Sequence, residues 1–204
     1  MRFLSVDEEN RLLAELDPKN EGRGIGKLQR GLRQDQYDYV VALLDTGGRA
    51  MEVAELPWSA VDFDTNTIHI HRSKTNQSTI LQMTDRLRAV LERRYQHRDN
   101  NNAYVFPSPN GGHRQYRCEA ILNAIDQAGL NDANIVRQKG GKVTLHTFRH
   151  TFCSRLAQAG VSLQKIAHLA GHSDIKTTMI YAHLVPSDVA GEAVNVLNGI
   201  RLRV

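Results

Sequence analysis

The chain has 204 residues, of which 41% are hydrophobic and 24% are charged, and this composition is ordinary for a globular protein with one core. Its two cysteines are too few for a disulfide framework or a four-cysteine zinc site. No apolar run approaches the roughly 18 residues that span a bilayer, and residues 1–17 show no signal-peptide pattern. We therefore expect one cytoplasmic domain over residues 1–204.

The distribution of charge is more informative than the net charge of +4. Residues 133–173 contain no acid, and residues 66–84 form a second acid-free stretch. Segments without negative charge are typical of surfaces that approach phosphate, although basic runs are also common on ordinary solvated faces. The basic residues that we expect on a phosphate-binding surface are Arg72, Arg137, Lys139, Lys142 and Arg155.

The N-terminal segment is predicted to be a helix followed by a loop. Ser5 and Glu8 have the spacing of a capping box, and leucines follow at helical intervals as far as Pro18. Residues 19–33 are rich in glycine and basic residues, which predicts a loop.

A second helix is expected around residues 37–44, where apolar residues recur at i, i+3, i+4 and i+7. The pair Gly47–Gly48 ends this helix, and Arg49 follows at once. A short helix over residues 50–56 is expected next, because Pro57 stops it.

The hydrophobic period then changes to two, which predicts strands. Apolar and polar residues alternate at 61–63 and at 68–70, and a third short apolar run covers 80–83, with Lys74 in the turn between the second and third strands. Helical spacing returns at 85–98, 116–128, 147–159, 163–170, 174–182 and 187–198. Glycines follow three of these helices where a left-handed residue is wanted: Gly129, Gly160 and Gly171. The expected fold class is mainly α with a small antiparallel three-stranded β-sheet (α+β).

Four short segments carry polar residues of the kinds used in catalysis. They are Thr46-Gly-Gly-Arg49-Ala-Met-Glu52, Ser73-Lys74-Thr75, His146-Thr-Phe-Arg149-His150-Thr151 and Ala170-Gly-His172-Ser-Asp-Ile-Lys-Thr-Thr-Met-Ile-Tyr181-Ala-His183. In this order they resemble the signature of the tyrosine recombinases, the phage-integrase family, over residues 3–185. An HxxR motif alone is weak, but HxxR followed by Gly-His and by a tyrosine nine residues after that histidine is specific.

The chemistry of DNA strand exchange accounts for these residue types. A tyrosine phenol such as that of Tyr181 can attack a phosphodiester and form a phosphotyrosyl ester that stores the bond energy for rejoining. The planar guanidinium of arginine matches two phosphate oxygens and stays charged, so Arg49 and Arg149 are expected to clamp the phosphate. Each well-placed donor of this kind contributes about 10²–10³ in rate.

The resemblance assigns roles to the remaining residues. Lys74 matches the general acid that protonates the leaving 5′-oxygen. His146 and His172 match histidines that bind the phosphate, and His146 also matches a group that helps to take the tyrosine proton. Glu52 matches the acid that positions the first arginine. The family needs no metal and no nucleotide cofactor, because one ester is exchanged for another of similar energy.

Each of these residues also has an ordinary structural interpretation when it is considered alone. Tyr181 is then a half-buried helix residue, and Lys74 a solvated turn lysine. A zinc site is a further alternative, because two histidine pairs have i, i+4 spacing, but neither pair encloses a glutamate. The pairs are His146 with His150 and His168 with His172.

The resemblance predicts a site-specific recombinase of a prophage or mobile element, acting on double-stranded DNA as a tetramer and monomeric without DNA. The alternatives are a DNA-relaxing enzyme of the type IB topoisomerase kind and a non-catalytic DNA-binding module of the same fold. The chain departs from the family pattern at Gly48, where a bulky apolar residue is more usual. Relatives generally carry a helical core-binding domain before the catalytic one, and we expect this chain to lack it, because residues 3–8 already resemble the first helix of the catalytic domain. A tail helix at about 187–200 is expected to dock on a neighbouring subunit or on its own domain.

Overall fold

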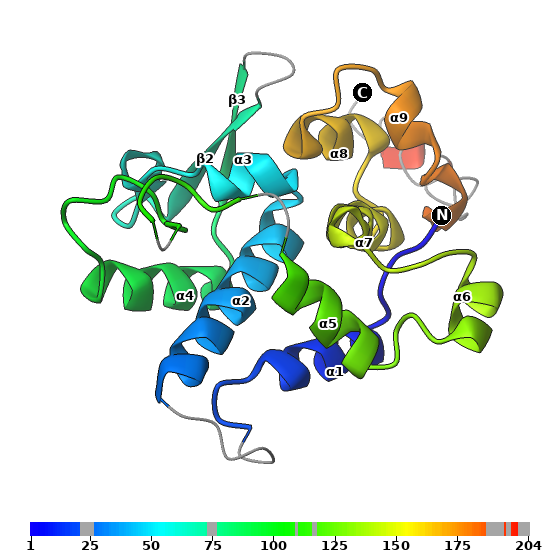
Figure 1. Cartoon of the computed structure of the whole chain (residues 1–204). Helices are drawn as coiled ribbons and strands as arrows, with labels where there is room; N and C mark the ends of the chain where they lie inside the picture. The colour runs from blue at the N-terminus through cyan, green and yellow to red at the C-terminus, as the bar shows by residue number, and fades with distance from the viewer. Residues whose placement is uncertain are drawn as a thin grey trace.

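The computed structural model describes residues 1–20, 27–72, 77–108, 110–115, 118–186, 194 and 197–199. Most of the molecule is helical, and a small sheet lies at one side (Figure 1). The N-terminal half contains α1 (Val6–Leu16), α2 (Lys27–Thr46), α3 (Ala50–Ala54), the 3-10 helix η1 (Trp58–Ala60), β1 (Val61–Asp62), β2 (Thr67–Arg72), β3 (Gln77–Gln82) and α4 (Asp85–Gln96). The C-terminal half contains α5 (Glu119–Gln127), α6 (Ala133–Lys139), α7 (Leu145–Gln158), α8 (Leu163–Ala170), α9 (Lys176–Met179) and the 3-10 helix η2 (Ala182–Leu184).

The three strands form an antiparallel sheet in the order β1–β2–β3. Ile68 on β2 pairs with Leu81 on β3, and Asn66 takes a left-handed conformation, with φ of 57°, in the turn before β2. Alternate residues of β2 are buried, as expected for a sheet with one face on the core. The predicted fold class is confirmed, with the three strands in the expected order.

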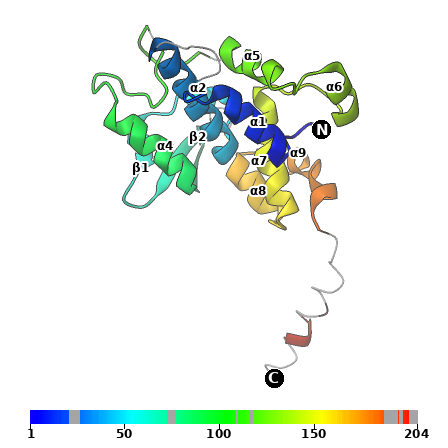
Figure 2. The same ribbon diagram turned by 90° about the horizontal axis from the view of Figure 1, so that it is seen from below.

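The main core lies where α2 packs against α7, with α1 and α5 side by side across one end (Figure 2). Residues 38–44 of α2 are all buried, so this part of the helix is enclosed on every side and not only on the predicted face, and Phe148 of α7 joins the same core. A second, smaller cluster lies between α7 and α8. Its buried members are Cys153, Ala157, Ile166, Ala170 and Tyr181. The predicted nucleophile is therefore a core residue of the second cluster.

One helix start and three helix ends form as the sequence predicts. The Ser5 Oγ atom accepts a hydrogen bond from the Glu8 backbone N–H at 3.2 Å, while Glu8 Oε2 accepts one from the Ser5 N–H at 2.9 Å. The three predicted left-handed glycines have φ of 68°, 79° and 69° at Gly129, Gly160 and Gly171.

The structure differs from the sequence predictions in two places, and a third prediction lies outside the described residues. Helix α2 already begins at Lys27, so the predicted loop over 19–33 is too long. Helix α6 was not predicted, because its seven residues have no apolar face that repeats over two turns. The predicted tail helix at 187–200 lies almost entirely outside the described residues.

Candidate active site

The turn between α2 and α3 presents the first arginine. Gly47 has φ of 57°, and a Cβ atom there would lie 2.4 Å from the Phe152 ring, so the position requires glycine on both counts. Arg49 is the N-cap of α3, and its Nη1 donates to Glu52 Oε1 at 2.6 Å. The Arg49 N–H also donates to Glu52 Oε2 at 2.8 Å. This pairing agrees with the expectation that Glu52 positions Arg49.

Glu52 itself is buried, with 1% of its side chain exposed. Burial opposes ionisation of its carboxyl group, but hydrogen bonds from the Arg49 backbone and from Arg72, with the charge of Arg72, lower its pKa below the usual value. The carboxylate is therefore ionised at neutral pH, and it compensates part of the positive charge around Arg49.

Helix α7 supplies the second arginine. The Arg149 side chain is buried, and its Nη1 donates to the Gly47 carbonyl oxygen at 2.8 Å. Within the described part of the chain, its Nη2 atom is buried and has no hydrogen-bond partner. Burial and the charge of Arg49 lower the Arg149 pKa to about 10, which leaves the guanidinium charged at neutral pH. One donor atom of Arg149 is thus buried without a hydrogen-bond acceptor among the described residues.

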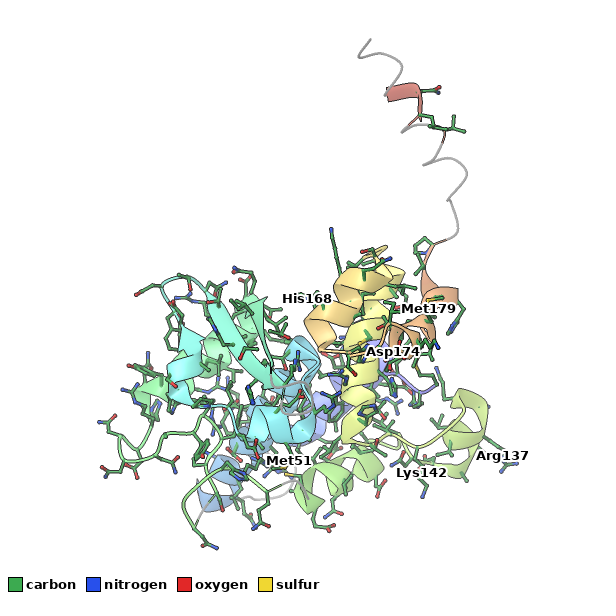
Figure 3. All side chains as sticks on the ribbon, turned by 90° about the horizontal axis from the view of Figure 1, so that it is seen from above. Met51, Arg137, Lys142, His168, Asp174 and Met179 are labelled. Atoms are coloured by element: carbon green, nitrogen blue, oxygen red, sulfur yellow. The ribbon has the colours of Figure 1, made fainter. Side chains whose placement is uncertain are left out.

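A pocket of about 210 Å³ separates α3 from the start of α7. Its lining residues are Gly48, Arg49, Ala50, Met51, Leu145, His146 and Arg149. Met51, which lines the pocket, and Lys142, three residues before Leu145, are on the same side of the molecule in Figure 3. Residues of α7 and of the α2–α3 turn, far apart in sequence, therefore meet in one pocket.

The imidazoles beside this pocket are held in the neutral form. Burial and the charges of Arg149 and Arg49 lower the pKa of His146. The same three causes, with a further contribution from Arg72, lower the pKa of His172 to about 4. His172 lies on a neighbouring pocket with Arg72 and Gly171, and its Nδ1 is hydrogen-bonded to Thr178 Oγ1 at 2.7 Å. Neutral imidazoles near two guanidiniums leave the arginines as the main positive charges of the site.

Tyr181 contacts the same face of α7, one turn beyond Arg149. Its side chain is 1% exposed, and its Oη lies 2.7 Å from His150 Nδ1. Burial, followed by the nearby Cys153 thiol, raises the pKa of the phenol above its usual range. The His150 ring also packs edge-on against the His146 ring, with centroids 4.7 Å apart. His146, Arg149, His150 and Cys153 have i, i+3, i+4 and i+7 spacing, so one helix face carries all of them.

The family model of the phage integrase family matches residues 2–187. The chain belongs to the phage integrase family. Tyrosine recombinase XerD of Brucella suis is 29% identical over 194 residues, which cover 90% of this chain and 59% of that protein. The chain thus spans 59% of the length of this relative.

Two solved structures of recombinases share the fold. The catalytic domain of bacteriophage HP1 integrase matches with a TM-score of 0.66 at 24% identity, covering 95% of this chain and 94% of that one. XerH recombinase bound to its difH substrate, in a pre-cleavage complex, matches with a TM-score of 0.72 at 19% identity, covering 97% of this chain and 55% of that one. The predicted family is therefore confirmed, and its catalytic-domain fold with it.

The remaining predicted residues of this phage integrase domain lie in several places. Arg137 and Lys139 on α6, with Lys142 just beyond it, are exposed to solvent (Figure 3). Lys74 lies outside the described residues, between the end of β2 and the start of β3. Arg155 pairs with Glu9 on α1, with Arg155 Nη1 and Glu9 Oε2 at 2.6 Å, so its charge is already compensated.

Arg72 requires a correction. It was expected on a phosphate-binding surface, but its side chain is 1% exposed and its Nη1 donates to Glu52 Oε2 at 2.7 Å. A guanidinium in this position cannot touch DNA. Residues 66–84 contain no acid, and this predicted that Arg72 is exposed. The sequence alone does not show that Glu52, twenty residues earlier, is the ion-pair partner of Arg72.

The sequence did not predict the role of His150 in this site. It indicated His150 only as a ligand in the alternative zinc site. The His150 Nδ1 instead bonds to Tyr181 Oη, and among the described residues no group of three His, Cys, Asp or Glu side chains has the arrangement of a metal site. The i+4 spacing from His146 was the available signal, because it placed His150 on the catalytic face of α7.

In the described ranges, no helix is long and apolar enough to cross a membrane.

Proposed function

We propose that this chain is the catalytic domain of a site-specific DNA recombinase that cleaves and rejoins DNA through a 3′-phosphotyrosyl intermediate on Tyr181, without metal or ATP. The observation that carries the proposal is the shared pocket of Arg49, His146 and Arg149, with Tyr181 against the same face of α7. XerD, a relative, is named a tyrosine recombinase, and XerH, which shares the fold, was solved bound to its difH substrate. We accordingly assign duplex DNA as the partner.

The pocket offers the donors that a phosphoryl-transfer transition state needs. We assign Arg149 Nη2, which is buried and has no partner among the described residues, to one non-bridging oxygen once the pocket opens on DNA, and the exposed part of Arg49, 32% of its side chain, to the other. His146 lines the same pocket and is exposed, and we assign to it donation to the phosphate or acceptance of a proton. Preorganised donors aimed at the developing negative charge stabilise the transition state without reorganisation during the reaction.

The proposed bond changes balance without a co-reactant. The Tyr181 oxygen forms a bond to phosphorus and gives its proton to the neutral imidazole of His146, as the resemblance implies, while the bond from phosphorus to the 5′-oxygen breaks. Lys74, as the resemblance implies, gives a proton to the leaving 5′-oxygen. Attack of a 5′-hydroxyl on the phosphotyrosyl ester then restores a DNA phosphodiester and the tyrosine. One ester replaces another in each step, so no nucleotide hydrolysis is needed to drive the exchange.

Tyr181 must become accessible before it attacks. A phosphate cannot reach a phenol whose side chain is 1% exposed and bonded to His150. The segment from α9 through η2, residues 176–184, therefore has to shift relative to α7 when DNA binds. The neighbouring α9 surface has Met179 and Ile180 exposed, so it is not anchored by burial of these side chains.

Exposed basic residues of α6 and of the loop after it are assigned to the DNA backbone. Arg137, Lys139 and Lys142 are exposed, and they lie in the acid-free stretch of the sequence. Contacts of this kind position the duplex and make binding weaken steeply with salt. Assembly of four protomers on two duplexes is part of the proposed reaction, with the protein monomeric in the absence of DNA.

Trapping of a covalent adduct tests this function. A duplex with a nick close to the cleavage position loses a short fragment after attack, so the adduct accumulates and survives a denaturing gel. We expect an adduct that maps to the peptide with Tyr181, and we expect none from Tyr181→Phe, which keeps its DNA affinity. An adduct on another residue, or an adduct that persists in Tyr181→Phe, would contradict the proposal. Relaxation of a supercoiled plasmid by the monomer would instead favour the topoisomerase alternative.

A further inference from the structure

We infer that Arg72 is a positioning residue for Arg49: its buried guanidinium holds one oxygen of Glu52 so that the other oxygen fixes Arg49 toward the phosphate. This inference rests on the proposed function, because it assigns a task to Arg49 in that reaction. It adds a residue for which the sequence analysis expected a different role, direct contact with DNA.

The contacts of Arg72 join three elements. From the end of β2, its Nη1 donates to Glu52 Oε2 on α3 at 2.7 Å. Its Nη2 donates to the Leu169 carbonyl oxygen in the last turn of α8 at 2.6 Å, and its Nε donates to Thr79 Oγ1 on β3 at 3.2 Å. A cation at a helix C-terminus is favourable, because unpaired carbonyl groups concentrate negative charge there. The three contacts fix the plane of the guanidinium.

Glu52 is shared between two arginines. Its Oε1 accepts from Arg49 Nη1 at 2.6 Å, whereas its Oε2 accepts from Arg72 Nη1 and from the Arg49 N–H. Both oxygens of the carboxylate are therefore engaged, and its plane cannot rotate without losing a charged hydrogen bond. The direction in which Arg49 points depends on that plane. Arg72 is the partner of Glu52 that does not itself face the pocket.

Gly171 makes room for this guanidinium. A Cβ atom at Gly171 would lie 2.5 Å from Arg72 Nε, and Gly171 also has φ of 69°. Gly48, where the sequence departs from the family pattern, lies next to the same group: a Cβ atom there would lie 3.8 Å from Arg72 Nη1, which is an ordinary contact distance, but 2.7 Å from Val53. The space for Arg72 therefore depends on Gly171, and the lack of a side chain at Gly48 is required by Val53.

Burial makes the arrangement sensitive to loss of one partner. Desolvation lowers the pKa of Arg72, while Glu52 opposes this shift, so the charged pair is kept only as long as both members are present. Without Arg72, the Glu52 carboxylate keeps only Arg49 as a cationic partner and turns toward it. We expect Arg49 to be drawn away from the pocket, and misplacement of a reacting group by about 1 Å costs roughly 10²-fold in rate.

Single-turnover cleavage of the nicked duplex tests the inference in Arg72→Gln, with Arg72→Lys as a second variant. Arg88→Gln is the matched control, because Arg88 also donates to a carboxylate and to a carbonyl, those of Glu92 and Phe63, but on α4. We expect Arg72→Gln to cleave roughly 10–100-fold more slowly. Arg72→Lys keeps the charge but not the three-way contact, so we expect an intermediate rate. Arg88→Gln should cleave within about twofold of wild type.

A second measurement separates positioning from a structural role and from DNA contact. In an Arg49→Ala background, adding Arg72→Gln should change the residual rate by less than about threefold, because a residue that acts through Arg49 has nothing left to position. A structural role predicts the same loss in both backgrounds. A phosphate contact predicts a salt slope of DNA binding that falls by about one in Arg72→Gln, whereas positioning leaves the slope unchanged.

The outcomes distinguish this inference from the proposed function. If wild-type protein forms no Tyr181 adduct, the proposed function itself fails. If wild type forms the adduct and both Arg72 variants cleave at its rate, only the inference fails. If Arg72→Gln does not fold, as judged by circular dichroism, Arg72→Lys and its combination with Arg49→Ala decide the question by the same criteria.

Discussion

The two arginines of the candidate site are held in opposite ways. Arg49, in the turn after α2, pairs with a buried carboxylate that a second buried arginine also contacts. Arg149, on α7, contacts only the Gly47 carbonyl among the described residues and retains a buried nitrogen without a partner. The first guanidinium shares one carboxylate with Arg72 and so has its charge compensated in part, whereas the second contacts no carboxylate among the described residues.

The charge of Arg149 adds to the effect of burial on the histidines of the α7 side. Burial is the largest cause of the lowered pKa values of His146, His150 and His172, and Arg149 is a further cause at each of them. In the proposed reaction, a phosphate that enters the pocket supplies the missing negative charge. We accordingly assign binding of the anion to the α7 side and a fixed geometry of Arg49 to the α3 side.

The largest effect is expected from removing the uncompensated arginine. Arg149→Ala should lower the rate of single-turnover cleavage by at least about 10²–10³-fold. This loss should exceed that in Arg49→Ala, because Glu52 already offsets part of the charge of Arg49. Rates on the same nicked duplex, at enzyme concentrations that saturate the DNA, give the comparison. A larger loss in Arg49→Ala than in Arg149→Ala would break the distinction between the two sides.

A smaller effect is expected on stability as the pH falls. His150 and His172 have a pKa of about 4 in the folded protein, below the ordinary 6.5, so the unfolded chain binds more protons in this range. The stability that depends on their neutral form is present above pH 6.5 and decreases between pH 6.5 and about 4. Glu52, whose pKa is lowered from 4.5, contributes only below pH 4.5. The decrease in stability between pH 6.5 and 4.5 therefore comes from the histidines of the α7 side.

Thermal melting of the DNA-free protein between pH 7 and 4.5 measures this effect. We expect the melting temperature to fall by several degrees, and we expect His172→Gln to flatten the slope. His71→Gln is the matched control, because His71 is exposed on β2. An unchanged slope in His172→Gln would show that its imidazole is not held neutral by the fold.

Elements with strong local signals were predictable from sequence. The α8 helix was predicted with its observed bounds, because Ser162 and Gly171 mark its two ends and its apolar residues repeat at helical spacing. The four motifs also identified the family, because residue type and spacing within a motif are set by local geometry. The convergence of Arg49 and Arg149 was a prediction of the family resemblance, and the pocket that they share agrees with it.

Features that depend on long-range partners were not predictable. Arg72 seemed exposed because no acid lies near it in sequence, yet Glu52 and the end of α8 enclose it. The contact of His150 with Tyr181 joins residues that are 31 positions apart, and no periodicity indicates it. Charge patterns show where cations are in the chain, but only packing decides which of them reach the surface.

A crystal structure of Tyr181→Phe bound to duplex DNA is the most direct test of the account. We predict that one phosphate occupies the pocket between α3 and α7, with one non-bridging oxygen on Arg149 Nη2 and the other on Arg49, while Arg72 stays on Glu52. A duplex that lies across this face with no phosphate in contact with both arginines would contradict it.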